Sequence, residues 1–225
     1  MCPWSDYAPA TIAFCERRLC AWVVEPSNAW SNVAYVLVGV WILWRRRARP
    51  ATSLTATGVG AVLLGLGSFS FHATGIRLFE VVDVSGMYLI SGLALTFALQ
   101  RALGWGDGAA VGFFAASVLV SSLLMVALGN NGIIVFAVQT VTAIAIETRL
   151  WSRTPADVRP WLLRAVVASV VGVVVWVLDK HGPLCHPDNH LVTGHAVWHV
   201  LTAVALLCFF HFHERLRDAG SMRTR

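Results

Sequence analysis

Apolar residues gather in seven long blocks that short polar segments separate. Each block is close to the roughly 20 residues that a helix needs to cross a bilayer. We place the blocks at 29–44, 53–71, 81–100, 109–128, 132–147, 161–178 and 192–212. The first and fifth blocks are short, and six spans are the alternative if the fifth only re-enters the membrane. The pattern predicts an all-α polytopic membrane protein, a seven-transmembrane helix bundle.

Basic residues concentrate in alternate loops and thereby predict the orientation of the bundle. Of the 17 lysines and arginines, all but Arg17, Arg18, Arg77 and Lys180 lie in the first, third and fifth loops, in the C-terminal tail or, for Arg164, just after the fifth loop. Cytoplasmic loops are enriched in such residues. We therefore expect one membrane domain over residues 1–225. Its N-terminal segment (1–28) would be extracytoplasmic and its tail (213–225) cytoplasmic.

Composition supports a membrane protein and narrows its partners. The chain is 57% hydrophobic and 13% charged, whereas a soluble domain is nearer half apolar and a quarter charged. The net charge of +5 follows from the topology, so we expect no nucleic-acid partner. Short loops without a sorting signal favour a bacterial inner membrane, and no feature indicates an oligomeric state.

Ionisable side chains are rare in the predicted spans, and the few that occur lie at one depth. Asp83 stands near the start of the third span and His72 at the end of the second. His195 and His199 lie in the first turns of the seventh. All four therefore lie toward the outer ends of their helices. Because ionisable residues inside a membrane are costly, they mark functional sites by default.

Three histidines at one depth suit a zinc ion. His195 and His199 are four residues apart, on one face of a helix, and His72 would supply the third ligand from a neighbouring helix. Zinc lowers the pKa of bound water to about 7, and Asp83 would orient that water or exchange protons with it. Ser68, one helical turn before His72, would donate to a developing oxyanion.

These residues also have ordinary structural interpretations. His195 and His199 suit interhelical hydrogen bonding, Ser68 suits close helix packing, and Asp83 could pair with Arg77. Five other histidines are weaker ligand candidates: His181, His186 and His190 in the loop before the last span, and His211 and His213 at its cytoplasmic end, where we expect interfacial positions.

Three segments together resemble the alkaline ceramidase family. "GSFSFHATGIRLFEVVDVSGMYL" keeps the family's spacing of a serine four residues before a histidine and an aspartate eleven after it, at Ser68, His72 and Asp83. "HAVWH" at 195–199 resembles its late His-Ala-Trp-Trp-His motif. "EPSNAWSN" at 25–32 resembles its first-helix element, a Glu followed by Asn three and seven residues later. The segments occur in the family's order, and its seven-helix architecture covers nearly the whole chain.

The resemblance implies a zinc-dependent amidase of a superfamily that includes the adiponectin receptors. Its substrate would be ceramide or a related N-acyl membrane lipid, cleaved to a fatty acid and a sphingoid base. The implied zinc ligands are His72, His195 and His199, with Ser68 stabilising the oxyanion and Asp83 assisting proton transfer. Asp179, at the end of the sixth span, would accept a hydrogen bond from a zinc-ligating histidine. Alternatively it caps Lys180 or faces water.

The resemblance also implies a calcium site near the N-terminus. The family's Asp-Trp-Cys-Glu-x-Asn stretch corresponds to "AFCERR" at 13–18, which has Ala13 and Arg18 in place of the aspartate and the asparagine. The remaining candidate calcium ligands, with the oxygen atoms that calcium favours, are Glu16, Glu25 and Asn28. The alternative is that the two glutamates pair with the arginines at 17 and 18.

Three cysteines are expected outside the helices on the oxidising face, at positions 15, 20 and 185. The resemblance implies a disulfide between Cys15 and Cys185, which would pin the N-terminal segment over the mouth of the zinc site. Cys20 is the competing partner, and spacing alone does not choose between them.

Three classes of function are compatible with this chemistry. A hydrolase is favoured because Ser68 and Asp83 accompany the histidines, whereas a structural zinc site usually closes its fourth position. A non-hydrolytic zinc-containing membrane receptor or lipid-binding protein is the alternative. A transporter that uses His and Asp as a relay is disfavoured, because the polar residues share one depth and form no path across the membrane.

Overall fold

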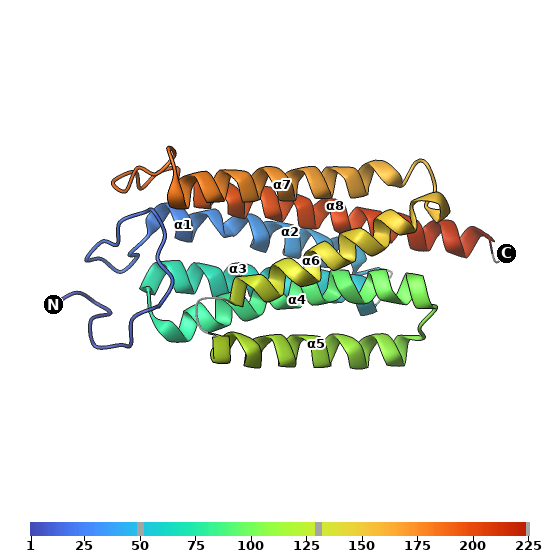
Figure 1. The fold of residues 1–225 in the computed structure, drawn as a ribbon, viewed down its shortest axis with the longest axis horizontal. Coiled ribbons are helices and arrows are strands. Elements are labelled where there is room, and N and C mark those ends of the chain that lie inside the picture. The colour runs from blue at the N-terminus through green and yellow to red at the C-terminus, as the bar shows by residue number, and fades with distance from the viewer. Residues whose placement is uncertain (49–51, 129–131, 224–225) are drawn as a thin grey trace.

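The computed structural model describes residues 1–48, 52–128 and 132–223 of the chain. Its helices run along one axis, with the N-terminal segment at one end and the C-terminus at the other (Figure 1). The elements are α1 (Pro26–Ser31), α2 (Val33–Arg46), α3 (Thr52–Thr74), α4 (Arg77–Leu103), α5 (Asp107–Leu128), α6 (Gly132–Arg149), the 3-10 turn η2 (Trp151–Arg153), α7 (Arg159–His181) and α8 (Gly194–Arg223). The all-α prediction is confirmed, because the described residues contain one isolated β-bridge and no strand.

Six helices, α3 to α8, are long and apolar enough to cross a membrane. The pattern also predicts a span at 29–44, but the structure divides this block into α1 and the 14-residue α2, with Asn32 between them. Polar residues stand at the start of this block, and one of them, Ser31, lies 2.8 Å from Nδ1 of His199 in α8. The block at 132–147, for which re-entry was the alternative, forms the full-length α6. Of the helices that correspond to the seven predicted spans, α2, in the first block, is therefore the shortest.

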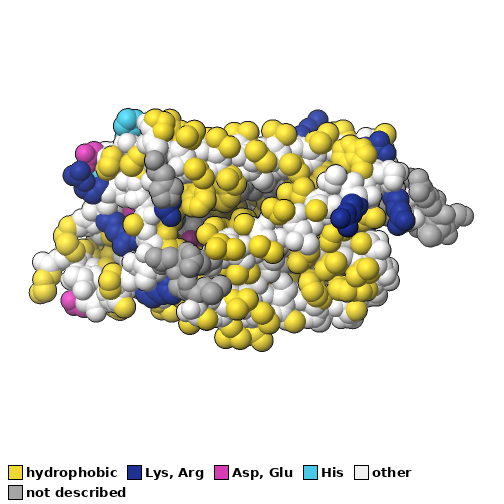
Figure 2. Space-filling view, in the orientation of Figure 1, with side chains coloured by type: hydrophobic (Ala, Val, Ile, Leu, Met, Phe, Trp, Pro, Cys, Tyr) yellow, Lys and Arg dark blue, Asp and Glu magenta, His cyan; other side chains and the backbone are white. Residues whose placement is uncertain are grey.

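Helices α3, α4 and α8 form the interior of the bundle. In each of them 56% of the most apolar stretch is buried, against 17% to 22% in α5, α6 and α7. The outer helices carry exposed apolar side chains such as Leu119, Leu123 and Val171. Figure 2 shows a broad hydrophobic face with Lys and Arg gathered toward its two ends. An apolar surface of this width is suited to lipid and would be unfavourable in water.

A tight turn at Gly75 joins α3 to α4 and brings His72 close to Asp83. Gly75 adopts a φ of +66°, a left-handed conformation that favours glycine. Its N–H donates to the carbonyl of Phe71 at 2.7 Å, which closes the last turn of α3. His72 precedes the turn and Asp83 follows it within two helical turns. Both side chains are therefore held at the same end of the bundle.

The N-terminal segment before α1 is not helical and lies against this same end. Its backbone is bound to the turn between α3 and α4: the N–H of Ala10 donates to the carbonyl of Gly75, and the N–H of Arg77 donates to the carbonyl of Ala8, both at 2.9 Å. These bonds place the residues that follow, up to Glu25, over the ends of α3, α4 and α8.

Two disulfides fix the N-terminal segment. Cys15 is bonded to Cys185 in the loop before α8, which confirms the pairing implied by the resemblance. Cys20 is bonded to Cys2, a cysteine that does not belong to the three expected on this face. Cys208, in α8, is buried and free. The disulfide Cys15–Cys185 therefore joins the segment to the loop that leads into the two histidines of α8.

Candidate metal centre

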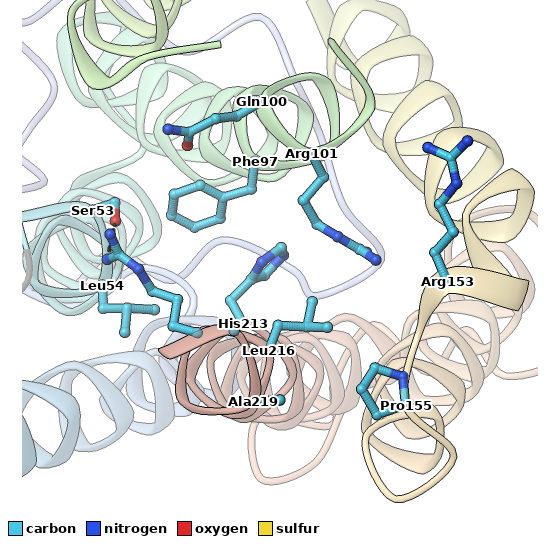
Figure 3. A pocket seen from close by; sticks show the side chains of 12 residues that line it. Ser53, Leu54, Phe97, Gln100, Arg101, Arg153, Pro155, His213, Leu216 and Ala219 are labelled. Atoms are coloured by element: carbon cyan, nitrogen blue, oxygen red, sulfur yellow. Dashed lines mark hydrogen bonds between the residues drawn. The ribbon is translucent and has the colours of Figure 1, made fainter. Parts of the chain in front are cut away.

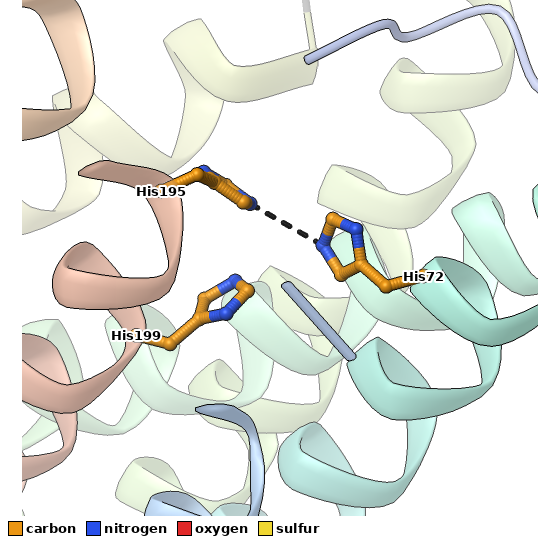
Figure 4. Close-up of side chains that lie close together, drawn as sticks. All are labelled: His72, His195 and His199. Atoms are coloured by element: carbon orange, nitrogen blue, oxygen red, sulfur yellow. Dashed lines mark hydrogen bonds between the residues drawn. The ribbon is translucent and has the colours of Figure 1, made fainter. Parts of the chain in front are cut away.

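Three histidine side chains converge inside the bundle, one from the last turn of α3 and two from the first turns of α8 (Figure 4). The Nε2 atoms of His72 and His195 are 3.3 Å apart, and the ring centroids of His195 and His199 are 4.4 Å apart. All three rings are buried. One ligand atom of each lies within 4.8 Å of the others, and among the residues described here this is the single such group.

The separation of two of these histidines fits a tetrahedral metal ion. With metal–nitrogen bonds of 2.0–2.1 Å, two ligand nitrogens of a tetrahedral zinc site lie about 3.3 Å apart. This is the separation of the Nε2 atoms of His72 and His195. The sequence prediction that His72, His195 and His199 come together is thus matched by the geometry.

Hydrogen bonds at the outer nitrogens fix the tautomers of two of the rings. His72 Nδ1 lies 2.7 Å from the Glu25 carboxylate, which can only accept, so Nδ1 carries the proton. His199 Nδ1 lies 2.8 Å from the hydroxyl of Ser31, which itself donates to the carbonyl of Asn28. This nitrogen is therefore also protonated. In both rings the Nε2 lone pair is left for a metal.

His195 is held by packing and by its backbone. Its Nδ1 is buried and has no hydrogen-bond partner among the described residues. The ring of Phe14, from the N-terminal segment, stacks on it with centroids 4.0 Å apart and an interplanar angle of 28°. The ring of Phe14 also packs against the ring of His72, with centroids 4.9 Å apart. The N-terminal segment therefore covers two of the three histidines.

Glu25 is a buried carboxylate that connects the metal centre to the N-terminal segment. Besides His72, it accepts hydrogen bonds from Arg18 Nε at 3.0 Å and from Asn28 Nδ2 at 3.1 Å. Burial opposes ionisation of Glu25, but the bonds with His72, Arg18 and Asn28 outweigh it, so the pKa of Glu25 lies below its usual value. Glu25 is therefore an anion that orients His72.

The other predicted calcium ligands also have partners within the protein. Glu16 accepts hydrogen bonds from the backbone N–H groups of Ser27 and Asn28, both at 2.9 Å. The side-chain oxygen of Asn28 accepts one from Thr193 at 2.6 Å. Of the alternative ion pairs, that of Glu25 with Arg18 forms, whereas Arg17 pairs with Asp188 and not with Glu16.

Asp179 holds the N-terminus of α8 and does not contact a histidine ring. It accepts hydrogen bonds from the backbone N–H groups of Gly194 at 2.9 Å and His195 at 3.3 Å. A Cβ at Gly194 would lie 2.5 Å from the Cβ of Asp179, so glycine is required for this approach of α7 to α8. The carboxylate that accepts a hydrogen bond from a candidate ligand histidine is therefore Glu25, which contacts His72, and not Asp179 as the sequence predicts.

A cavity of about 360 Å³ adjoins the histidines. Ser68 and Asp83 lie on its wall and contact each other, with His195 and His199 beside them. Most of the remaining wall is apolar and comes from α3, α4, α6, α7 and α8, and Phe14 of the N-terminal segment is part of it. Figure 2 shows the face of the molecule hollowed in this region. The arrangement offers metal ligands and two polar groups to an apolar guest molecule.

Asp83 is not bound to Arg77, which pairs instead with Glu80. Trp198 packs against Trp176 and has no part in the histidine cluster. The hydroxyl of Ser68 and the carboxylate of Asp83 are both buried within this cavity.

The remaining histidines lie away from the cluster. His186 is exposed in the loop before α8, and His190 contacts Glu16. The side chain of His181 lies outside the described residues. His211 packs beside Trp161, a half-buried position. The ring of His213 is buried among phenylalanines of α4 and α8, and its expected interfacial position stays a prediction.

Comparisons with known proteins were consistent with this site. The family model described as Ceramidase matches residues 6–224. The chain is 26% identical to alkaline ceramidase YPC1 of Saccharomyces cerevisiae, over 95% of this chain and 78% of the yeast protein.

We predict that His199→Ala loses bound metal, because two imidazoles form an incomplete site for a divalent ion. The measurement is elemental analysis of the purified protein by mass spectrometry after reconstitution with zinc. His186→Ala is the matched control, since this exposed histidine stands outside the cluster, and it should retain wild-type metal. Full metal content in His199→Ala would show that the three histidines are a packing cluster.

Proposed function

Because the chain belongs to the ceramidase family, we propose that it is a zinc-dependent membrane amidase. It would hydrolyse the N-acyl bond of ceramide or a related lipid to a fatty acid and a sphingoid base. The observation that carries the proposal is the placement of Ser68 and Asp83 in one apolar cavity with His195 and His199. A receptor that holds zinc only as a structural element would have no need of these two polar groups beside it.

His72, His195 and His199 would hold the metal, and Glu25 and Ser31 would keep two of them in the required tautomer. When bound, zinc supplies a Lewis acid that polarises the amide carbonyl and makes water more acidic. Carboxylate partners of ligand histidines strengthen metal sites by roughly 10–100-fold. Glu25 is thus a positioning residue that acts through His72.

Asp83 and Ser68 would assist the two halves of the hydrolysis. Asp83 accepts a proton from the attacking water and returns it to the nitrogen of the leaving sphingoid base. Ser68 donates a hydrogen bond from its hydroxyl to the negative charge that develops on the carbonyl oxygen. Water adds to the acyl carbon, the C–N bond then breaks, and a carboxylic acid and an amine leave.

The cavity suits a lipid that enters from the membrane. Its wall is mainly apolar, and its volume falls within the roughly 300–1,000 Å³ of small-molecule sites. Residues of α6 and α7, such as Phe136 and Trp176, line it, so hydrocarbon chains would lie between these helices. Phe14 and the N-terminal segment separate the metal centre from the aqueous side.

We infer a topology of seven spans, with α1 and α2 together as the first and the N-terminus outside. The two ends of the chain lie at opposite ends of the bundle, as an odd number of spans requires (Figure 1). The disulfides at the N-terminal end suit an oxidising compartment. Of the basic residues that predict this orientation, Arg49 and Arg225 lie outside the described residues. The bacterial inner membrane stays a prediction, since the matched relative is from yeast.

We predict that Asp83→Asn retains the metal but lowers ceramide turnover by roughly 100-fold or more, the size of a general acid–base contribution. Release of labelled fatty acid and metal content should be measured on the same preparation. Asp157→Asn removes an exposed carboxylate in the loop before α7 and should leave both unchanged. Wild-type turnover by Asp83→Asn would exclude the proposed role of Asp83. A wild-type protein that binds zinc but cleaves no N-acyl lipid would favour the receptor.

We further infer that Arg18 takes the place that a calcium ion would occupy near Glu25. Its guanidinium lies 3.0 Å from the Glu25 carboxylate and donates to the carbonyl of Ile12. Carboxylate and carbonyl oxygens are the ligands that calcium uses, and here they already contact a cation. Because Asn28 also donates its amide to Glu25, these residues do not fit the ion.

We predict that calcium leaves the thermal midpoint of the wild-type protein unchanged, because Arg18 already neutralises Glu25. Arg18→Asn should lower the midpoint, since it leaves a buried carboxylate without its cation, and added calcium should restore part of the loss. Arg17→Asn is the matched control: Arg17 forms an ion pair with the exposed Asp188, so the midpoint should stay close to wild type. A wild-type midpoint that rises with calcium would refute the substitution of arginine for the ion.

A further inference from the structure

A second cavity, of about 370 Å³, lies at the opposite end of the bundle (Figure 3). It is formed where α3 begins and where α4 and α8 end, with η2 on one side. His213 lines it and follows His199 by 14 residues along α8, which is about 21 Å at 1.5 Å per residue. The cavity is therefore separate from the metal centre. Its polar and aromatic lining residues include Ser53, Phe97, Arg101, Arg153, His213 and Arg217.

Positive charge in this cavity exceeds negative charge. Arg101 is neutralised by Glu147 and also donates to Thr154 at 3.1 Å. Arg217 donates a hydrogen bond to the hydroxyl of Ser53 at 2.9 Å. Because this hydroxyl is neutral, the bond does not compensate the positive charge of Arg217. Among the described residues, no carboxylate lies within ion-pair distance of Arg153 or Arg217. Two guanidinium groups are thus available to an anion.

A buried nitrogen in the cavity also lacks a partner. His213 is 6% exposed, and its Nε2 has no hydrogen-bond partner in the part of the chain that the structure describes. Its ring packs against Phe97 and Phe209, with centroids 4.6 Å and 4.4 Å away. In Figure 3 it extends from α8 toward Arg101 on α4. A buried polar atom without a partner costs free energy, and a ligand in this cavity would supply one.

The position and the lining of the cavity indicate the chemistry of its ligand. Arginine pairs with phosphate through two parallel hydrogen bonds. Phe97, Leu54 and Leu216 give the cavity an apolar wall beside these cations. Basic pockets between transmembrane helices on the cytoplasmic side bind the head groups of anionic lipids. We propose that this cavity binds the phosphate group of an anionic membrane phospholipid.

In this arrangement Arg153 of η2 and Arg217 of α8 contact the phosphate. His213 donates a further hydrogen bond to the phosphate from Nε2. Arg101 keeps its bond to Glu147 and adds a further positive group on α4. The glycerol backbone lies against the apolar wall. The lipid would join the ends of α4, α8 and η2, which lie far from the amidase chemistry, so the proposal does not rest on the proposed reaction.

The test is lipid binding to the full-length protein in neutral detergent, followed by native mass spectrometry. Phosphatidic acid, phosphatidylcholine and inorganic phosphate are titrated separately. The double variant Arg153→Gln/Arg217→Gln removes the two available cations. Arg164→Gln/Arg215→Gln is the matched control: both arginines are exposed at the same end and contact Trp161 outside the cavity. Both double variants change the net charge equally.

Phosphatidic acid should bind in preference to phosphatidylcholine. The double variant of the cavity should weaken this binding roughly tenfold or more, as expected for the loss of two basic contacts to an anionic head group. The matched control should bind as the wild type does. Equal weakening in both double variants would attribute binding to general surface charge and overturn the proposal. Inorganic phosphate that displaces the lipid at equal concentration would identify a free-phosphate site and overturn the lipid assignment.

Discussion

The buried carboxylate of Glu25 is the interaction on which this end of the molecule depends. A buried charge is tolerated only when it is paired and hydrogen-bonded. Glu25 meets this requirement with three partners from three parts of the chain: Arg18 of the N-terminal segment, Asn28 of α1 and His72 of α3. Moving any of these elements would leave the carboxylate, or its partner, buried without compensation. The orientation of His72 is therefore tied to the position of the N-terminal segment.

The same physical requirement recurs at the two helices beside it. Glu16 accepts the first free N–H groups of α1, and Asp179 accepts those of α8. A carboxylate at a helix N-terminus satisfies donors that have no partner within the helix and complements the helix dipole. The disulfide Cys15–Cys185 then joins the residue before Glu16 to the loop before α8. Covalent and electrostatic links thus hold Ser31, His195 and His199 in register across a bundle whose other contacts are mainly apolar.

The sequence predicted the helices and the three histidines because both leave simple patterns. Apolar blocks of membrane length give the spans, and His72, His195 and His199 are conspicuous in such blocks. Block length alone does not reveal that the first block is divided at Asn32, because the bonds of Asn32 are local and leave no mark on hydropathy.

The partners of the histidines were less accessible from the sequence. The resemblance to the family singles out Glu25 and Asn28, but it implies that they are calcium ligands. Their actual bonds to His72, Arg18 and Thr193 depend on how the N-terminal segment folds back. Phe14 and Ser31 carried no signal, because an aromatic residue in a loop and a serine in a helix are common. The cation that Arg18 provides could be suspected from its place in "AFCERR", but only coordinates show that it reaches Glu25.

We infer that three imidazoles, two of them oriented by Glu25 and Ser31, form a metal site beside a lipid cavity. Zinc K-edge X-ray absorption on the purified protein tests this claim most directly. We predict a four-coordinate spectrum with three imidazole nitrogens at 2.0–2.1 Å and one oxygen ligand from solvent. A spectrum dominated by sulfur or by carboxylate oxygen, or a protein that retains no zinc, would contradict it.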